Sequence, residues 1–395
     1  MPDFCNAIAA PALVRPPAAR RKWGRGHRRS VISSSVVARV LLGVSLLQAT
    51  LMILPPAHWG LWLARFVALE ACLLAALTGA GALILGLGPI EQGLAVAGIV
   101  AGLLPALAAV PAYVREGQPF SILAWLGGGR GAEGAVERDL VLAPGLLADL
   151  YRAPGAGPHP FVVVVHGGSW RSGDKGDAAH VSRALARAGF SVIDVRYRLA
   201  PEHRFPAAVE DVKCMLGQVC ARAAELGIDP GRGALLGRSA GAQIALIAAY
   251  SGPEIAPAFG APEAKVRAVV SIYGPTDLSW CHANPFFPDV VKGTEALEQY
   301  LGGTPAEAPE AYRLATPQSW VGGALPPTLI VHGTAERCVR PDNAERLRDA
   351  LTARGHSVRT LLVPWADHGF DVRAGGLGEQ LTRGVLIDFL KQHLS

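Results

Sequence analysis

Three parts of the sequence carry side chains whose types and spacing suit nucleophilic catalysis, and the first surrounds Ser239. This serine lies in the pentapeptide GRSAG at 237–241, between an expected strand at 234–237 and an expected helix at 240–250. The two glycines permit a sharp turn that exposes the serine oxygen. The amino end of the following helix favours negative charge that develops nearby. We therefore predict that Ser239 is a nucleophile.

The base and the acid of such a site are expected further along the chain. His368, in the sequence ADHGF at 366–370, follows the last expected strand and precedes the last expected helix. A serine hydroxyl needs such a base at neutral pH. Glu336 follows an expected strand at 328–332 and would hold the histidine in one tautomer. Three rival acids stay open at this point, namely Asp342, Asp367 and Asp371.

A second glycine-rich turn would supply hydrogen-bond donors. The sequence HGGSW at 166–170 follows a continuous apolar run at 161–165, which is typical of a buried parallel strand. The backbone amides of Gly167 and Gly168, together with the amide of Ala240, are expected to form an oxyanion hole. An ordinary turn at a strand end is the alternative interpretation of the same glycines.

The elements that would position these residues alternate between strand and helix after about residue 135. Strands are expected at 136–142, 146–151, 161–165, 191–195, 234–237, 266–273, 328–332 and 357–363, and helices at 178–188, 207–226, 240–250, 343–353 and 378–394. This alternation predicts the α/β class, with a mostly parallel sheet covered by helices on both faces. The order nucleophile, acid, base is that of the α/β-hydrolase fold.

Residues 135–395 resemble the hormone-sensitive-lipase-like esterases and the related feruloyl-esterase-like hydrolases. The resemblance is carried, in the family's order, by HGGSW at 166–170, YRLAPEHRFPAA at 197–208, GRSAG at 237–241, HGTAE at 332–336 and DHGF at 367–370. It implies an esterase-type fold with Ser239 and His368 in the triad, Glu336 at the acid position and Gly167 and Gly168 at the oxyanion turn. Many members carry a third glycine in place of Ser169 and aspartate in place of Glu336.

A stretch at 274–326 has weak periodicity and is expected to be an insertion that roofs the active site. The aromatic residues expected at the pocket are Trp170, Trp280, Phe286, Phe287 and Trp320. A small satellite core built from the aromatic residues of the insertion is the alternative.

The first third of the chain has a different character. Apolar runs lie at 36–55, 66–88 and 93–114, and each is close to the ~20 residues that a helix needs to cross a bilayer. We expect a membrane module at 31–115 with three transmembrane helices, followed by a linker at 116–134. A buried helical bundle, or a cleaved signal peptide in place of the first run, is the alternative.

The charge of the first 30 residues predicts the topology of this module. Residues 1–30 hold seven basic side chains and one acidic side chain, and such an excess marks a cytoplasmic flank. With three spans the catalytic domain would lie on the outer, periplasmic or extracytoplasmic, side of the cell membrane. Two spans would leave it in the cytoplasm. A nucleic-acid partner is not expected, because an apolar run follows the basic residues at once.

Together these features predict a multi-pass membrane protein whose serine hydrolase domain cleaves carboxylic esters through an acyl-enzyme intermediate. We expect a small-molecule or lipid-like ester as the substrate and no cofactor. No metal is expected, since the six cysteines contain no C-x-x-C pair. Amide or peptide hydrolysis, acyl transfer by the same serine and non-catalytic ligand binding on the same fold are the alternatives. The oligomeric state is not indicated.

Overall fold

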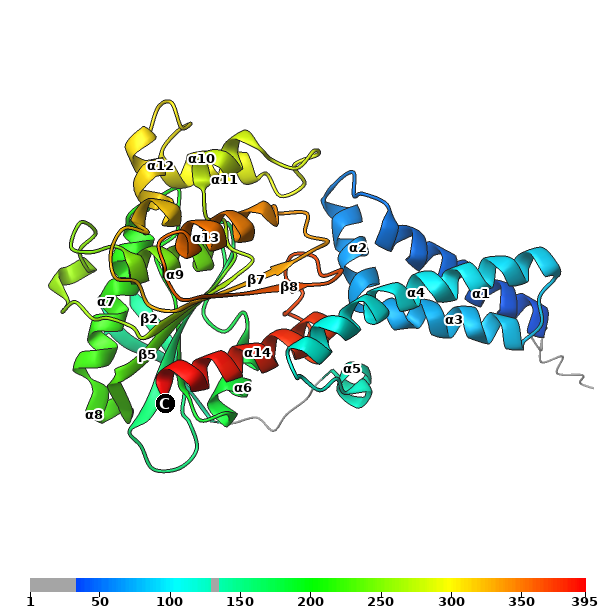
Figure 1. Ribbon diagram of the computed structural model, residues 1–395, viewed down its shortest axis with the longest axis horizontal. Coiled ribbons are helices and arrows are strands. Elements are labelled where there is room, and N and C mark those ends of the chain that lie inside the picture. Colours follow the sequence, from blue (N-terminus) through cyan, green and yellow to red (C-terminus); the bar gives the residue numbers. More distant parts are fainter. Residues whose placement is uncertain (1–32, 129–134) are drawn as a thin grey trace, which may run out of the picture.

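A computed structural model of the chain describes residues 33–128 and 135–395, and the larger part is built on an eight-stranded sheet (Figure 1). The strands lie in the order β1-β2-β4-β3-β5-β6-β7-β8. β1 and β2 run antiparallel to their neighbours, and all the other neighbours are parallel. The bounds are Val136–Ala143 for β1, Leu146–Tyr151 for β2, His159–Val165 for β3, Ser191–Val195 for β4, Ile228–Arg238 for β5, Ala268–Ile272 for β6, Thr328–Gly333 for β7 and Val358–Val363 for β8.

Helices cover both faces of this sheet because its central strands are apolar on both sides. Val163 and Val165 of β3 belong to one hydrophobic cluster, and Val162 and Val164 belong to another, since successive strand side chains point to opposite faces. The first face is covered by α7 (Ala207–Ala221), α9 (Ala240–Tyr250) and α13 (Asp342–Thr352), and the second by α6 (Ala179–Arg187) and α14 (Leu377–Leu394). The expected mostly parallel sheet with helices on both faces is confirmed, and the fold is that of the α/β-hydrolases.

Two expected elements of the α/β domain differ in their bounds from those in the structure. The helix expected at 207–226 is divided into α7 and α8 (Ala223–Leu226), because Arg222 leaves the helical conformation with φ −99° and ψ 22°. The strand expected at 234–237 begins earlier, at Ile228, because Ile228 already pairs with His159 of β3.

The segment between β6 and β7 holds α10 (Leu278–Ala283), α11 (Gly293–Leu301), α12 (Pro309–Ala315) and a 3-10 turn, η2 (Pro317–Trp320); another such turn, η1 (Ala258–Gly260), precedes β6. The three helices lie above the sheet in Figure 1. Their buried residues, among them Leu278, Tyr300 and Tyr312, join the hydrophobic cluster on the first face of the sheet.

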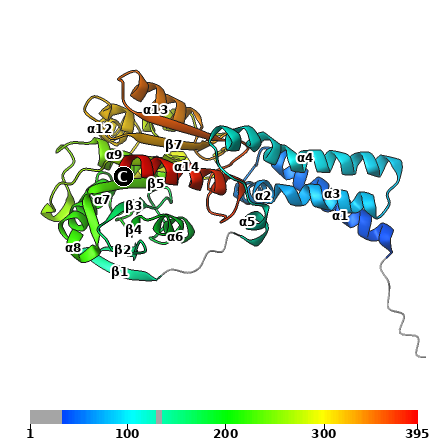
Figure 2. The same ribbon diagram turned by 60° about the horizontal axis from the view of Figure 1, so that its bottom comes forward.

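The amino-terminal part forms a helical projection that stands away from the sheet (Figures 1 and 2). It consists of α1 (Ser34–Ile53), α2 (Trp59–Glu70), α3 (Cys72–Ile84) and α4 (Pro89–Arg115), and α5 (Ile122–Gly127) follows at its base. Among the described residues, α1 and α4 are each long and apolar enough to cross a membrane. If the bent pair of α2 and α3 is counted as a single span, the projection has three spans.

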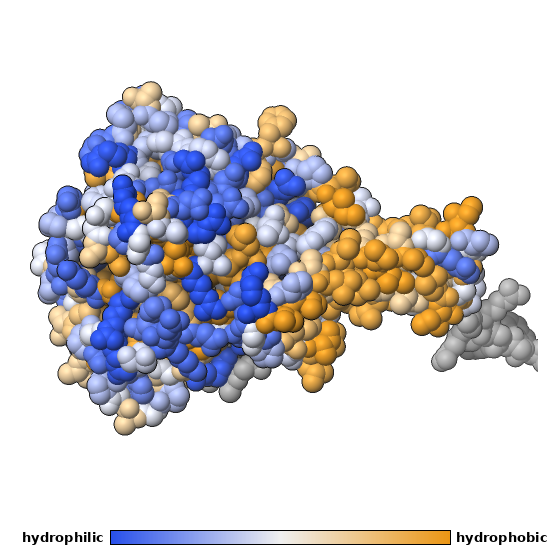
Figure 3. All heavy atoms as spheres, viewed as in Figure 1, coloured by the Kyte–Doolittle hydropathy of each residue, from blue (hydrophilic) through white to orange (hydrophobic). Residues whose placement is uncertain are grey.

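Small residues let α1, α3 and α4 approach closely. A Cβ atom placed on Gly98 of α4 would lie 2.2 Å from Oγ of Ser45, and one on Gly102 would lie 2.6 Å from the backbone nitrogen of Ala76. Such close backbone contacts are typical of helices packed in lipid. The outer surface of the projection is hydrophobic over most of the face that Figure 3 shows.

The second expected apolar run, at 66–88, is not one straight helix. It is divided at Ala71, where α2 and α3 meet at an angle of 71°. Ala71 has φ −105° and ψ 21°, and the side-chain amide of Gln48 donates a hydrogen bond of 2.7 Å to its carbonyl oxygen. This bond satisfies a backbone group that the break removes from the helix.

The projection and the sheet share one hydrophobic cluster. Ala109, Ala112 and Tyr113 of α4 belong to the same cluster as Val385 and Phe389 of α14. The Tyr113 hydroxyl also donates a hydrogen bond of 2.6 Å to the carbonyl oxygen of Leu377. The described part of the expected linker at 116–134 contains α5, whereas the expected basic tail at 1–30 lies outside the described residues.

Candidate active site

Ser239 lies at a tight turn between β5 and α9. Its backbone has φ 54° and ψ −123°, a strained conformation that projects the side chain out of the turn. Glycines make this turn possible. A Cβ atom on Gly237 would lie 2.1 Å from the carbonyl oxygen of Gly241, and one on Gly241 would lie 2.2 Å from that of His166. The pentapeptide GRSAG therefore folds locally into the turn that its glycines predict.

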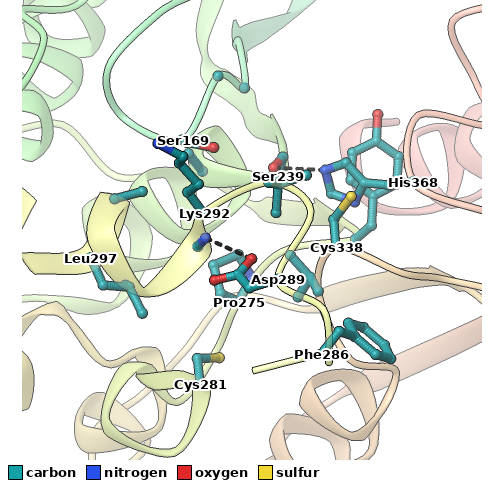
Figure 4. Close-up of a pocket in the computed structure, with 18 of the residues that line it drawn as sticks. Ser169, Ser239, Pro275, Cys281, Phe286, Asp289, Lys292, Leu297, Cys338 and His368 are labelled. Atoms are coloured by element: carbon teal, nitrogen blue, oxygen red, sulfur yellow. Dashed lines mark hydrogen bonds between the residues drawn. The ribbon is translucent and has the colours of Figure 1, made fainter. Parts of the chain in front are cut away.

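His368 and Glu336 complete a chain of hydrogen bonds that begins at Ser239, and Figure 4 shows the first bond, between Ser239 and His368. Nε2 of His368 lies 2.9 Å from Oγ of Ser239, and Nδ1 lies 2.9 Å from Oε2 of Glu336. The other carboxylate oxygen of Glu336 accepts hydrogen bonds from the backbone amides of Cys338 (2.7 Å) and Val339 (3.2 Å). The turn after β5 and the loops after β7 and β8 thus place a hydroxyl, an acid and a base in line.

The charges of this chain favour an ionised acid beside the imidazole. Burial alone would raise the pKa of Glu336, but the charge and the hydrogen bond of His368 hold it below its usual value. Burial alone would lower the pKa of His368, but the carboxylate of Glu336 raises it above its usual value, with smaller contributions from Asp367 and Asp371. A carboxylate that accepts from Nδ1–H leaves Nε2 free to accept the proton of Ser239.

The three residues expected to form the oxyanion hole line one cavity together with Ser239. A Cβ atom on Gly167 would lie only 3.1 Å from Cβ of Ser239, so this glycine lets the turn after β3 approach the serine. Gly168 has φ +112°, a conformation that glycine adopts without strain. Ala240 is the first residue of α9, and an amide in that position has no acceptor within its own helix.

Of the three rival acids, two form ion pairs elsewhere. Asp371 accepts hydrogen bonds from both Nε (2.8 Å) and Nη2 (2.7 Å) of Arg238 and from the Tyr273 hydroxyl (2.5 Å). This buried pair ties the loop that carries His368 to the residue that precedes Ser239. Asp342 begins α13, and no described hydrogen bond joins it to His368.

Asp367, the third rival, receives its partner from the amino-terminal projection. Arg65 of α2, only 4% exposed, forms a buried ion pair with Oδ2 of Asp367 and donates a hydrogen bond of 3.2 Å to the carbonyl oxygen of Ala335. Oδ1 of Asp367 accepts from the backbone amides of His368 (2.8 Å) and Arg337 (2.9 Å). Arg65 therefore contacts both loops of the triad, a role that its sequence neighbourhood, a short connection between two apolar runs, does not indicate.

Replacing Arg65 by methionine is expected to destabilise the protein by about 3–5 kcal/mol, since breaking a buried ion pair leaves an uncompensated charge. Burial and Glu336 already raise the pKa of Asp367 to about 6, and Arg65 opposes this shift. The loss of stability should therefore become smaller as the pH falls and Asp367 is protonated. Thermal unfolding of the protein at several pH values measures the loss of stability.

The matched control is the double variant Arg65→Met with Asp367→Asn. Asparagine keeps an oxygen for the two backbone amides and removes the buried charge, so the double variant should recover much of the lost stability. Equal destabilisation of the single and double variants would mean that the charge of Asp367 is not the cause.

A cavity of about 770 Å³ opens above the triad (Figure 4). Three of the five expected pocket residues, Trp170, Trp280 and Phe286, line it. Two do not. Phe287 is 99% exposed and points into solvent, whereas Trp320 packs against the main hydrophobic cluster and donates to the carbonyl oxygen of Leu314. Trp59 and Trp62 of α2 also line the cavity, and the sequence analysis did not include them.

One group of described residues has the composition of a metal site. Ligand atoms of Glu336, Cys338 and His368 lie within 4.8 Å of one another. Both imidazole nitrogens of His368 already form hydrogen bonds. Burial also raises the pKa of the Cys338 thiol well above its usual value, which disfavours the thiolate that would bind a metal. The hydrogen-bonded chain from Ser239 to Glu336 therefore describes this group better than a metal centre does.

Comparison with known proteins places the chain among relatives named esterases. Esterase LipC of Mycobacterium tuberculosis is 30% identical over 257 residues, which is 63% of this chain and 62% of LipC. Carboxylesterase NlhH of the same species is 32% identical over 217 residues, which is 53% of this chain and 66% of NlhH. The matched region covers 62%, 58% and 53% of the lengths of LipC, LipQ and LipM.

A solved structure and a family model give the same result as the comparison with these relatives. The structure of a hyperthermophilic esterase from the archaeon Pyrobaculum calidifontis is similar with a TM-score of 0.55 and 26% sequence identity, over 72% of this chain and 88% of that one. A family model described as BD-FAE matches residues 148–351, which is 204 of the 395 residues. The chain belongs to the BD-FAE family.

Proposed function

We propose that this protein is a membrane-tethered serine hydrolase that cleaves carboxylic esters. The observation that carries the proposal is the unbroken chain of hydrogen bonds from Ser239 through His368 to Glu336, at the floor of a cavity that reaches solvent. Relatives named esterase and carboxylesterase support the choice of an ester over an amide.

The reaction would proceed in two steps. Oγ of Ser239 attacks the ester carbonyl carbon while Nε2 of His368 takes the hydroxyl proton, and the alcohol then leaves with that proton. Water attacks the acyl-enzyme in the same manner, with His368 again as the base, and releases the acid. The amides of Gly167, Gly168 and Ala240 would stabilise the oxyanion, and Glu336 would stabilise the imidazolium.

The tether would consist of α1, α4 and the bent pair of α2 and α3. α1 begins at the end of the projection that lies far from the sheet, and α4 returns to the sheet (Figure 1). The basic residues before α1 favour the cytoplasm, so an odd number of crossings places the cavity on the outer side. Arg39 and Glu91, which form an ion pair of 2.9 Å at the far end, would then lie at the cytoplasmic surface.

A fluorophosphonate that cannot cross membranes tests two predictions together: that Ser239 is the nucleophile, and that the cavity lies on the outer side of the membrane. Intact cells that express the full-length protein should be labelled, and peptide mapping should find the label on Ser239. The same protein should hydrolyse p-nitrophenyl acetate. Labelling only after lysis would place the cavity in the cytoplasm and contradict the three crossings. A folded protein that neither reacts nor hydrolyses the ester would instead favour a ligand-binding role.

The pH dependence follows from the pKa of His368. The base must be neutral, so kcat/KM should rise with pH through the pKa of His368, which the carboxylate of Glu336 raises above the usual value of about 6.5. Glu336→Gln removes the cause of this increase, and the acidic limb of the residual activity should move to lower pH. Initial rates between pH 5 and 9, with p-nitrophenyl acetate as substrate, measure both curves. An unchanged limb would exclude Glu336 as the cause.

A further inference from the structure

An aromatic row on α2 joins the surface of the molecule to the catalytic base. The rings of Trp59 and Trp62 stack with centroids 4.6 Å apart, and those of Trp62 and Phe66 stack at 6.1 Å. Trp59 and Trp62 line the cavity above Ser239. Phe66 lies beside the residue after the base, since its Cε2 would be 3.9 Å from a Cβ atom placed on Gly369. The row therefore runs from Trp59, which is 53% exposed, to the loop of His368.

The exposed side of α2 is hydrophobic. Leu61, Leu63 and Val67 are exposed, whereas the two charged residues of the helix, Arg65 and Glu70, are buried against the sheet domain. A helix with tryptophan at one end and an apolar outer face is typical of a position in the interfacial plane of a bilayer. The 71° bend between α2 and α3 turns α2 across the end of the projection rather than along it.

The short helix α5, near the junction of the projection and the sheet domain, also exposes apolar side chains. α5 lies at the base of the projection (Figure 1) and exposes Ile122, Leu123 and Leu126. It is attached to the loop that follows His368, because the guanidinium of Arg373 donates to the carbonyl oxygen of Trp125. The hydrophobic surface of the projection extends to the edge of the sheet domain (Figure 3). The apolar faces of α2 and α5 are thus continuous with helices that are long enough to span a bilayer.

The wall that α2 gives to the cavity is aromatic. Trp59 and Trp62 both line the cavity, and their rings stack on one another. The chain of a bound ester that lies along this wall would cover the two indole rings and remove apolar surface from water.

We propose that α2 is the membrane-facing wall of the active site and that the substrate is a lipid ester taken directly from the bilayer. Its apolar chain would lie along Trp59 and Trp62 and bring the ester carbonyl to Ser239. The inference rests on the esterase function proposed above and adds to it the class of substrate, the route of entry and two residues that determine specificity.

The experiment uses the full-length protein in phosphatidylcholine vesicles and two substrates. Dioleoylglycerol is placed either in the same vesicles as the protein or in separate, protein-free vesicles, and release of oleate is followed. p-Nitrophenyl acetate, supplied in the water phase, reports the chemical step. The variants are Trp59→Ala, Trp59→Phe and, as a matched control, Phe259→Ala, since Phe259 is 55% exposed but does not line the cavity.

We expect oleate release at least about tenfold faster from the shared vesicles than from separate ones. Trp59→Ala should lower that rate about tenfold, because part of the chain loses its apolar contact, and should lower p-nitrophenyl acetate hydrolysis much less, because an acetyl group has no chain to lie along the ring. Trp59→Phe and Phe259→Ala should leave both rates close to those of the wild type.

Three results would overturn the inference while the esterase proposal survives. They are equal rates from shared and separate vesicles, equal losses on both substrates in Trp59→Ala, and hydrolysis of p-nitrophenyl acetate without any release of oleate. Failure of the wild-type protein to hydrolyse either ester would overturn the esterase proposal itself, and the inference with it.

Discussion

Replacing Ser239 by alanine is expected to lower kcat for ester hydrolysis by about six orders of magnitude, as loss of a triad nucleophile does. The hydroxyl lies 2.9 Å from Nε2 of His368, and no other described hydroxyl has a hydrogen bond to this imidazole. The alanine variant should therefore lack both the attacking atom and the proton that His368 removes. Initial rates with p-nitrophenyl acetate, corrected for uncatalysed hydrolysis, measure the loss.

Substrate binding should persist in this variant, because the cavity and the oxyanion donors are unchanged. The control is Ser279→Ala, which removes the hydroxyl of an exposed serine on α10 and should retain wild-type rates. Thermal unfolding shows whether both variants are folded. A folded Ser239→Ala protein that keeps a tenth of the wild-type activity would place the nucleophile elsewhere.

The parts of the structure that the sequence predicts well are those determined by local patterns. The bounds of β2, β4 and α9 agree residue by residue with the expected ranges, because each apolar pattern ends at a polar residue, namely Arg152, Arg196 or Ser251. The turn at Ser239 is local as well, since GRSAG contains the glycines that its geometry needs. Parallel strands then bring the loops after β5, β7 and β8 to one edge of the sheet, where Ser239, Glu336 and His368 meet.

The contacts that the sequence does not reveal join residues far apart in the chain. Arg65 and Asp367 are separated by 302 positions, and no local spacing relates them. Hydrophobicity alone extends the second apolar run through Glu70, yet Glu70 is buried against the loop around Gly376 and the helix breaks at the next residue. Phe287 was expected at the pocket, and the structure places it in solvent. Its type suggests a pocket, but the loop that carries it turns its side chain outward.

Trp59 and Trp62 show why a division into a membrane part and a catalytic part misplaces the site. Both lie in the connection between two apolar runs, where tryptophan is expected for interfacial anchoring alone. The bend at Ala71 carries them onto the rim of the cavity instead. A protein cut before residue 135 would keep Ser239, Glu336 and His368 and lose one wall of the cavity.

Replacing Glu336 by glutamine is expected to lower kcat by about four orders of magnitude, because it forces the wrong tautomer on His368. The backbone amides of Cys338 and Val339 both donate to Oε1 of Glu336. In the variant these two donors should keep the amide oxygen of glutamine in that position and turn its NH₂ group towards Nδ1. Nδ1 must then accept, Nε2 must carry the proton, and His368 can no longer accept the proton of Ser239.

The control is Asp342→Asn, which removes the charge of the one rival acid without a described ion pair and should leave the rate within a few fold of the wild type. Rates on the high-pH plateau of each profile exclude a simple effect of the pKa, because His368 is neutral there in both proteins and only its tautomer differs. A large loss in Asp342→Asn together with a small loss in Glu336→Gln would transfer the role of the acid to Asp342. The two backbone amides predict the opposite, since they orient Glu336 alone.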